Sequence, residues 1–106
     1  ALAINAAKKK HRKIVAVGTS TVRALETVVV SGFMVSPKRG WTDKFIYPPY
    51  DYKMVDSMVT NFHMPKSTLM MMVSAFAERD FLMKAYREAK KNGYNFLSYG
   101  DAMLIL

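Results

Sequence analysis

The sequence contains no cysteine among its 106 residues, which excludes disulfide bonds and thiolate metal ligands. It also has no apolar run of the roughly 18 residues that a membrane-spanning helix needs. Acidic residues are few, with 8 Asp and Glu against 16 Lys and Arg, so the formal net charge is +8. No repeat and no low-complexity tract interrupts the chain. These absences favour a soluble, cytoplasmic protein with at most one packed domain.

Positive charge is concentrated near the N-terminus. Of the six residues from Lys8 to Lys13, five are Lys or Arg and the sixth is His11. Such a cluster attracts polyanions, and each phosphate that it neutralises makes binding more sensitive to salt. It is also typical of a solvated helix end, because cations suit a helix C-terminus. Charge alone therefore leaves nucleic-acid contact and a solvated helix end equally open.

The order of apolar runs and chain breakers predicts an α/β fold. We expect strands at residues 13–17, 44–47, 54–62, 96–99 and 102–106. We expect helices at residues 1–7, 22–30, 67–77 and 81–91, and a loop at 31–42. Strands separated by helices of this length predict a mainly parallel sheet flanked by helices.

The segment VGTSTVRALE places hydroxyl residues between a strand and a helix. Gly18 ends the strand, and Thr19, Ser20 and Thr21 follow it. Free N–H groups and hydroxyls at a helix start can hold a phosphate or a carboxylate, and Arg23 adds further donors. The spacing is neither a Walker loop nor a dinucleotide fingerprint. Simple capping of the helix is the alternative interpretation.

A second polar group stands where an apolar strand meets an apolar helix, in TNFHMPKST. His63 can act as an acid or a base near neutral pH, and Asn61 can donate and accept hydrogen bonds. Lys66, Ser67 and Thr68 form another helix start, which can bind an anion or cap the helix. Without a cysteine or a second histidine nearby, we expect no metal.

The third candidate lies near the C-terminus, in SYGD, where Asp101 follows a glycine and precedes an apolar run. Asp56 is another carboxylate in an apolar run, and Arg23, Lys53 and Lys66 are its available partners, since an unpaired buried charge is costly. We expect the three candidate segments to converge on one sheet edge, where α/β folds bind ligands.

Together these segments resemble the C-terminal part of the S-adenosylmethionine:tRNA ribosyltransferase-isomerase family of queuosine biosynthesis. VAVGTSTVRALE is similar to the family's I-A-V-G-T-T-S-V-R-x-L-E, TNFHMPKST to its T-N-F-H-L-P-x-S-T, and FLSYGDAM to its F-F-S-Y-G-D-A-M. The resemblance runs in register over almost the whole chain. Pro49 departs from it, because the family has Gly there, with more backbone freedom and an N–H donor.

The resemblance implies a fold and a reaction for a longer protein. Residues 1–106 are then the C-terminal segment of the larger α/β domain of a two-domain enzyme, whose N-terminal two-thirds are absent. The enzyme transfers and isomerises the ribosyl moiety of S-adenosylmethionine to 7-aminomethyl-7-deazaguanine at the anticodon wobble position of tRNA. Epoxyqueuosine forms, and adenine and methionine leave. S-adenosylmethionine is thus a consumed substrate and no cofactor is implied; we expect no membrane partner and a monomeric full-length form.

Residue chemistry within this resemblance suggests individual roles. We expect His63, together with Asp101, to carry the proton transfers. The expected substrate-binding residues are Thr19, Ser20, Thr21, Arg23, Asn61, Lys66, Ser67, Thr68 and Tyr99. The alternative function is a basic RNA-binding module without catalytic activity. We expect the 106 residues alone to be inactive in either case.

Overall fold

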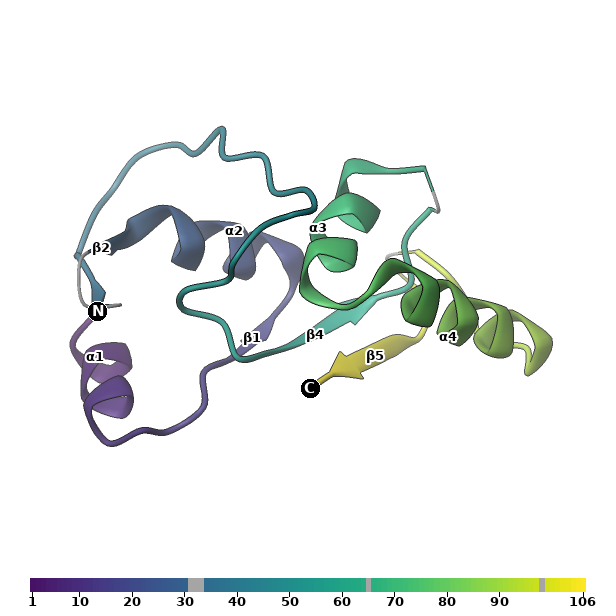
Figure 1. Ribbon diagram of the computed structural model, residues 1–106, viewed down its shortest axis with the longest axis horizontal. Helices are drawn as coiled ribbons and strands as arrows, with labels where there is room; N and C mark the ends of the chain where they lie inside the picture. The colour runs from purple at the N-terminus through teal and green to yellow at the C-terminus, as the bar shows by residue number, and fades with distance from the viewer. Residues whose placement is uncertain (31–33, 65, 98) are drawn as a thin grey trace.

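The computed structural model describes residues 1–30, 34–64, 66–97 and 99–106 of the chain (Figure 1). Its elements are α1 (Leu2–Lys9), β1 (Val15–Val17), α2 (Thr19–Val28), β2 (Val29–Val30), β3 (Met34–Val35), β4 (Ser57–Asn61), α3 (Thr68–Phe76), α4 (Arg79–Lys91) and β5 (Ala102–Ile105). Within the described residues, no helix has the length and apolar character needed to cross a membrane.

The main sheet has three strands in the order β1-β4-β5. Val59 at its centre pairs with Val17 in a parallel ladder and with Leu104 in an antiparallel one. The α/β class is confirmed, but the prediction of a mainly parallel sheet is wrong for the described residues, because the sheet is mixed. Two helices in succession separate β4 from β5, so the chain re-enters the sheet at the end where β4 left it and runs back along it.

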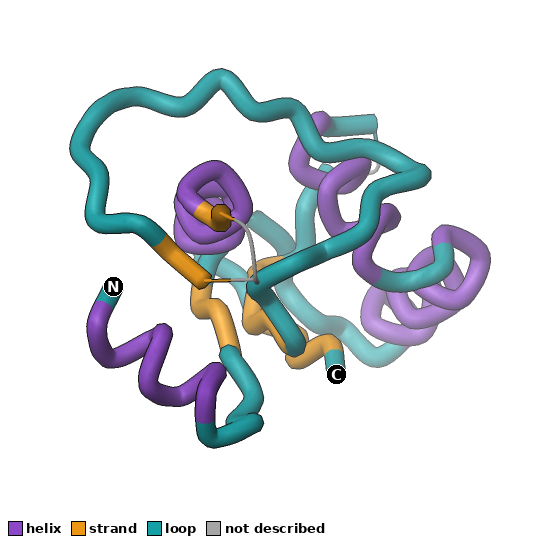
Figure 2. Tube along the Cα trace, turned by 60° about the vertical axis from the view of Figure 1, so that its left-hand side comes forward, coloured by secondary structure: helices purple, strands orange, loops and turns teal. Residues whose placement is uncertain are grey.

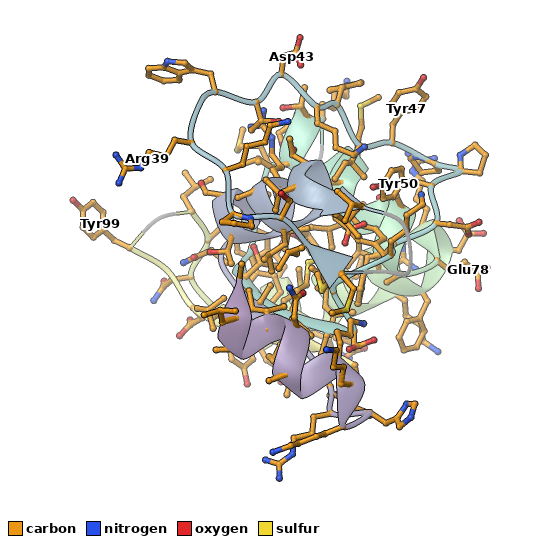
Figure 3. The ribbon with its side chains drawn as sticks, turned by 90° about the vertical axis from the view of Figure 1, so that its left-hand side faces the viewer. Arg39, Asp43, Tyr47, Tyr50, Glu78 and Tyr99 are labelled. Carbon is orange, nitrogen blue, oxygen red and sulfur yellow. The ribbon has the colours of Figure 1, made fainter. Side chains whose placement is uncertain are left out.

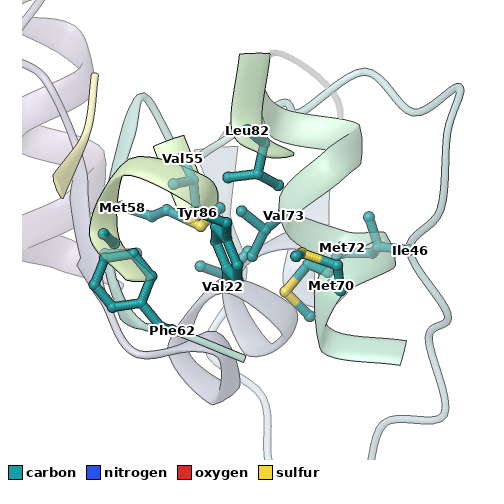
Figure 4. Close-up of a cluster of buried hydrophobic side chains, with 12 residues drawn as sticks. Val22, Ile46, Val55, Met58, Phe62, Met70, Met72, Val73, Leu82 and Tyr86 are labelled. Carbon is teal, nitrogen blue, oxygen red and sulfur yellow. The ribbon is translucent and has the colours of Figure 1, made fainter. Parts of the chain in front are cut away.

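Helices α2, α3 and α4 pack over one face of this sheet, and the core lies between them (Figure 4). Its buried members include Ala16 and Met58 from the sheet, Val22 from α2, Val73 from α3 and Leu82 from α4. Side chains alternate between the two faces of a strand. The opposite face accordingly presents the row from Val17 through Val59 to Leu104, of which the two outer members are exposed.

The N-terminal helix α1 is joined to a two-stranded ribbon of β2 and β3. The Asn5 side-chain amide donates to the carbonyl of Val35 at 3.0 Å, and its oxygen accepts from the Val35 N–H at 2.8 Å. The amide thus pairs with β3 as a neighbouring strand would. Figure 2 shows the long loop after β3, which passes over α2 before the chain enters β4.

Three helices follow the predicted bounds to within about two residues, and α2 begins three residues earlier than expected. Helix α2 starts at Thr19, so the predicted hydroxyl residues form its first turn, and it ends at Val28, after which Val29–Val30 is strand β2. Helix α4 buries Leu82, Tyr86 and Ala89 on one face and is followed by Gly93 with φ of 77°. Helix α3 is not buried all round, because Met71 is exposed.

Two predicted strands are absent from the described residues. Residues 44–47 form a loop, in which the side chain of Ile46 enters the core without the segment pairing to a strand. The described residues of the predicted strand at 96–99 form a turn, and Leu97 has φ of 71°; residue 98 lies outside the described residues. A short apolar run suits a strand but also suits a loop that packs against the core, so the sequence pattern did not separate the two.

Candidate functional site

A pocket of about 350 Å³ lies at the carboxyl ends of β1 and β4. Parallel strands end at the same edge of a sheet, and the helices that follow begin there. The pocket is lined by Gly18, Thr19, Ser20, Thr60, Asn61, His63, Met64, Ser67, Leu69 and Leu97. The starts of α2 and α3 therefore meet at one edge, as predicted. A pocket of this volume is within the range that small-molecule ligands occupy.

A larger pocket, of about 510 Å³, lies between α1, α2 and the segment after β3. Most of its wall is aliphatic, and Ser36, Lys38 and Arg39 are its polar side chains. None of the residues for which the sequence suggests chemistry lines it. We therefore place the candidate site in the smaller pocket, where polar groups converge.

The first wall of the site is the N-terminus of α2. Gly18 is the N-cap, with φ of 92°, a conformation that glycine adopts without strain. Its N–H donates to the carbonyl of Val59 at 2.8 Å, which fixes the helix start to β4. Among the described residues, no side chain makes a capping hydrogen bond at this helix start, so the structure does not support the capping interpretation of the hydroxyls here. Thr19 and Ser20 line the pocket beside N–H groups that the helix itself leaves unpaired.

The second wall is the N-terminus of α3, where Ser67 is a true cap. Its hydroxyl accepts from the N–H of Met70 at 3.1 Å and donates to the carbonyl of Met64 at 2.8 Å. The capping interpretation is confirmed for this residue, although Ser67 also lines the pocket. Lys66 and Thr68 on either side are exposed and do not line it.

His63 stands between these walls and is half-buried. Its Nε2 lies 2.6 Å from the hydroxyl oxygen of Thr60, and its backbone N–H donates to the phenolic oxygen of Tyr86 at 2.9 Å. Burial lowers the pKa of His63 below its ordinary value of 6.5, so the imidazole is neutral at pH 7. A neutral imidazole has one N–H donor and one acceptor nitrogen for use in the pocket.

The rim of the site is completed by the chain that follows α4. The Asn61 side-chain amide donates to the carbonyl of Leu97 at 3.1 Å, and the N–H of Leu97 donates to the carbonyl of Phe62 at 2.9 Å. Phe62 in turn stacks on Phe96, with ring centroids 5.0 Å apart. These contacts hold the segment against the end of β4 and explain why Leu97 reaches the pocket.

Asp101 has a local partner instead of a place in the pocket wall. Its Oδ2 accepts from the N–H of Asn95 at 2.7 Å, and its own N–H donates to the carbonyl of Asn95 at 2.8 Å. Gly100 makes this closure possible, because a Cβ there would lie 2.4 Å from the Asn95 carbonyl oxygen. Asp101 therefore closes the loop from residue 95 to residue 101 in the structure.

The structure thus divides the predicted site residues into two groups. The pocket brings together Thr19, Ser20, Asn61, His63 and Ser67. Its described lining does not include Thr21, Arg23, Lys66, Thr68, Tyr99 or Asp101. Tyr99 is fully exposed and points away from the body of the molecule (Figure 3).

Two residues near the site received no role from the sequence. Thr60 belongs to the second motif, but its hydroxyl contacts His63 only because the chain turns after β4. Glu26 lies on the same face of α2 as Val22 and is buried. It accepts hydrogen bonds from the segment before β4, including one from Tyr50, whose pKa is raised first by burial and then by the Glu26 charge. The sequence signal for the burial of Glu26 was its position four residues after Val22, on the same face of the helix.

Asp56 also has other partners than the predicted ones. Its Oδ2 accepts from the N–H of Ile14 at 2.7 Å and lies 3.7 Å from the Lys8 ammonium. In the part of the chain that the structure describes, no three His, Cys, Asp or Glu side chains gather in a way that could hold a metal ion.

Comparison with known proteins identifies relatives over the whole chain. The family model described as "Queuosine biosynthesis protein" matches residues 1–105. S-adenosylmethionine:tRNA ribosyltransferase-isomerase of Symbiobacterium thermophilum is 58% identical over 106 residues, which are 100% of this chain and 31% of that protein. The protein of the same name from Natranaerobius thermophilus is 56% identical over 102 residues, 96% of this chain and 30% of that protein.

A solved structure is similar as well. The crystal structure of S-adenosylmethionine tRNA ribosyltransferase from Thermotoga maritima matches with a TM-score of 0.86 and 53% sequence identity, over 97% of this chain and 36% of that one. The chain thus spans about a third of the length of the proteins that it matches.

Proposed function

This chain belongs to the queuosine biosynthesis protein family, and on that premise we propose that it is part of an S-adenosylmethionine:tRNA ribosyltransferase-isomerase. The proposed enzyme transfers and isomerises the ribosyl moiety of S-adenosylmethionine to 7-aminomethyl-7-deazaguanine at the wobble position of tRNA. Epoxyqueuosine-tRNA, adenine and methionine are the products. S-adenosylmethionine is consumed, and no separate cofactor takes part. We place the enzyme in the cytoplasm as a monomer and the chain in the larger of two domains.

The observation that carries this proposal is the convergence of Thr19, Ser20, Asn61 and His63 on one pocket. The reaction needs an anion site for the methionine carboxylate. The start of α2, where the described residues make no side-chain cap, offers N–H groups and hydroxyls at the positive end of a helix. It also needs proton transfers beside the sulfonium and at the departing adenine. His63 is the titratable side chain in the described pocket wall, and we give it this task.

The remaining predicted residues have weaker support. Asp101 is bonded to Asn95, so its predicted catalytic role stays a prediction. Arg23, Lys66 and Tyr99 lie outside the pocket wall. Their side chains are suited to contacts with the tRNA, and we give them that role. The polynucleotide is much larger than the pocket and must extend over its surroundings.

Assay of a protein of the relatives' full length that carries this sequence tests the proposal. It should release adenine from S-adenosylmethionine only when tRNA with the precursor base is present, and the 106 residues alone should not. Replacement of His63 by Ala should lower kcat by about 100-fold or more, as expected for loss of an acid or base. Full turnover by this variant at saturating substrates would show that His63 does not transfer the protons.

An RNA-binding module without activity is the second candidate. The observation in its favour is the exposure of Lys9, at the end of α1, and of Lys10, Arg12 and Lys13 after it. Under this alternative, the full-length protein would bind unmodified RNA hairpins with a steep dependence on salt and would release no adenine. Adenine release that depends on the precursor base excludes it.

A further inference from the structure

Thr60 lies on β4, on the face of the sheet that the helices cover, and only 3% of its surface is exposed. Its hydroxyl oxygen is 2.6 Å from Nε2 of His63, a short distance for a hydrogen bond between neutral groups. The two residues lie three positions apart in the sequence, and the chain turns between them at the end of β4. Both line the pocket, so their contact belongs to the candidate site.

The direction of this hydrogen bond follows from what else the hydroxyl can reach. A threonine hydroxyl has one hydrogen to donate, and burial makes an unused donor costly. The described residues offer this hydroxyl no acceptor other than Nε2 of His63. If Nε2 carried a hydrogen, the hydroxyl hydrogen would have no acceptor among the described residues. The arrangement that satisfies both groups is donation from Thr60 to a bare Nε2.

The proton of the neutral ring must then be on Nδ1. Burial keeps the pKa of His63 below its ordinary value, so a single ring proton is present at neutral pH. With Nε2 accepting from Thr60, that proton occupies the other nitrogen. No described residue makes a hydrogen bond with Nδ1, which leaves its N–H for a molecule in the pocket.

We propose that Thr60 is a positioning residue that holds His63 in its Nδ1–H tautomer, so that the imidazole presents a hydrogen-bond donor to an acceptor atom of the substrate. This inference rests on the proposed function and makes it more specific. It narrows the proton-transfer task proposed above for His63: because the Thr60 hydroxyl occupies the lone pair of Nε2, His63 acts through its Nδ1–H at the departing adenine and not as the base beside the sulfonium. A neutral histidine that donates a hydrogen bond stabilises negative charge as it develops, for example on a ring nitrogen of a departing purine.

Nuclear magnetic resonance of the 106-residue chain tests the tautomer without any assay of activity. The protonated and bare nitrogens of a neutral imidazole give well-separated 15N signals in long-range 1H–15N spectra. The chain has two histidines, so the variant His11→Gln assigns the signals of His63. At pH 8 we expect a proton on Nδ1 and a bare Nε2 in the wild type and in Thr60→Ser. In Thr60→Val, which removes the hydroxyl at similar volume, the proton should move to Nε2 in most molecules.

A proton on Nε2 in the wild type would overturn the inference, and this result does not depend on whether the Thr60 variants fold. An Nδ1 proton that persists in Thr60→Val would show that another group sets the tautomer. The amide spectra of the two variants report whether each keeps the fold.

Kinetics of the full-length protein give the second test. Thr60→Val should lower kcat for adenine release about tenfold with KM for S-adenosylmethionine little changed, and Thr60→Ser should restore the rate. An equal loss in both variants contradicts the positioning role. If the tautomer is as stated but no adenine is released, the proposed function fails and the positioning of His63 stands.

Discussion

The buried Glu26 carboxylate of α2 accepts a 2.7 Å hydrogen bond from the backbone N–H of Met54, although the two residues lie 28 positions apart along the chain. The same carboxylate accepts from the N–H groups of Lys53 and Val55 and from the Tyr50 hydroxyl. It thereby fixes the chain that leads into β4 against the helix that follows β1. The start of α2 and the carboxyl end of β4 line the pocket, so Glu26 ties together the two elements that carry those residues.

Replacement of Glu26 by Gln should destabilise the fold. One carboxylate oxygen becomes an NH₂ group, which in either orientation of the amide faces at least one backbone N–H donor and leaves it without an acceptor. We expect the free energy of unfolding to fall by about 2 to 4 kcal/mol. Urea titration followed by circular dichroism measures the change. Glu88→Gln, at an exposed position of α4, is the matched control and should change it by less than about 0.5 kcal/mol. Equal effects of the two variants would contradict the role of Glu26.

His63 should make stability depend on pH. Its pKa in the folded state lies below the ordinary value of 6.5, so the folded chain binds this proton less readily than the unfolded chain. The contribution of neutral His63 to the free energy of unfolding is complete above pH 6.5. It is lost as the pH falls through that value towards the lower pKa of the folded state. Free energies of unfolding of the wild type and His63→Gln, measured from pH 8 to pH 5, should therefore converge towards acid pH.

Two observations would argue against this account. Wild type and His63→Gln that differ by a constant amount over the whole range would show that His63 titrates alike in both states. His11→Gln removes the exposed imidazole that follows α1 and should retain the wild-type fall in stability. If this control variant abolished the fall, the dependence would belong to His11.

Ser67→Ala should weaken the start of α3. The hydroxyl is the acceptor for the Met70 N–H, and loss of such a cap costs about 1 kcal/mol. Thr68→Ala is the matched control, since Thr68 is the first residue of the helix and exposed, and its hydroxyl makes no side-chain hydrogen bond within the described residues. Chemical denaturation of both variants separates them. A larger loss for Thr68→Ala would place the cap one residue later.

Features that depend on local chemistry were predictable from the sequence. The Ser67 cap, the amphipathic face of α4 and the stop at Gly93 each rest on residues within a few positions of one another. The meeting of the two hydroxyl-rich helix starts also followed, because it needs only the parallel pairing of two strands with their following helices.

Features that depend on distant partners were not predictable. The direction of β5 follows from two helices packing side by side on one face. Glu26 has its role only because the segment before β4 passes within hydrogen-bond distance of α2. The side chain of Ile46 is buried in the core although Ile46 lies in a loop, and the sequence of this loop has the same apolar pattern as a strand. Asp101 was predicted as a site residue because it follows a glycine and precedes an apolar run, and the sequence pattern did not predict its hydrogen bond to Asn95.

Thr19 and Thr21 offer a matched test of the anion site at the start of α2. The two residues have the same side chain and lie in the same helical turn, but only Thr19 is part of the pocket wall. Replacement by Val removes the hydroxyl and keeps the branched shape. In the full-length protein, Thr19→Val should raise KM for S-adenosylmethionine about tenfold, the equivalent of one hydrogen bond to a charged group. Thr21→Val should change it less than about twofold, and a comparable rise in both variants would indicate that the substrate does not contact this wall.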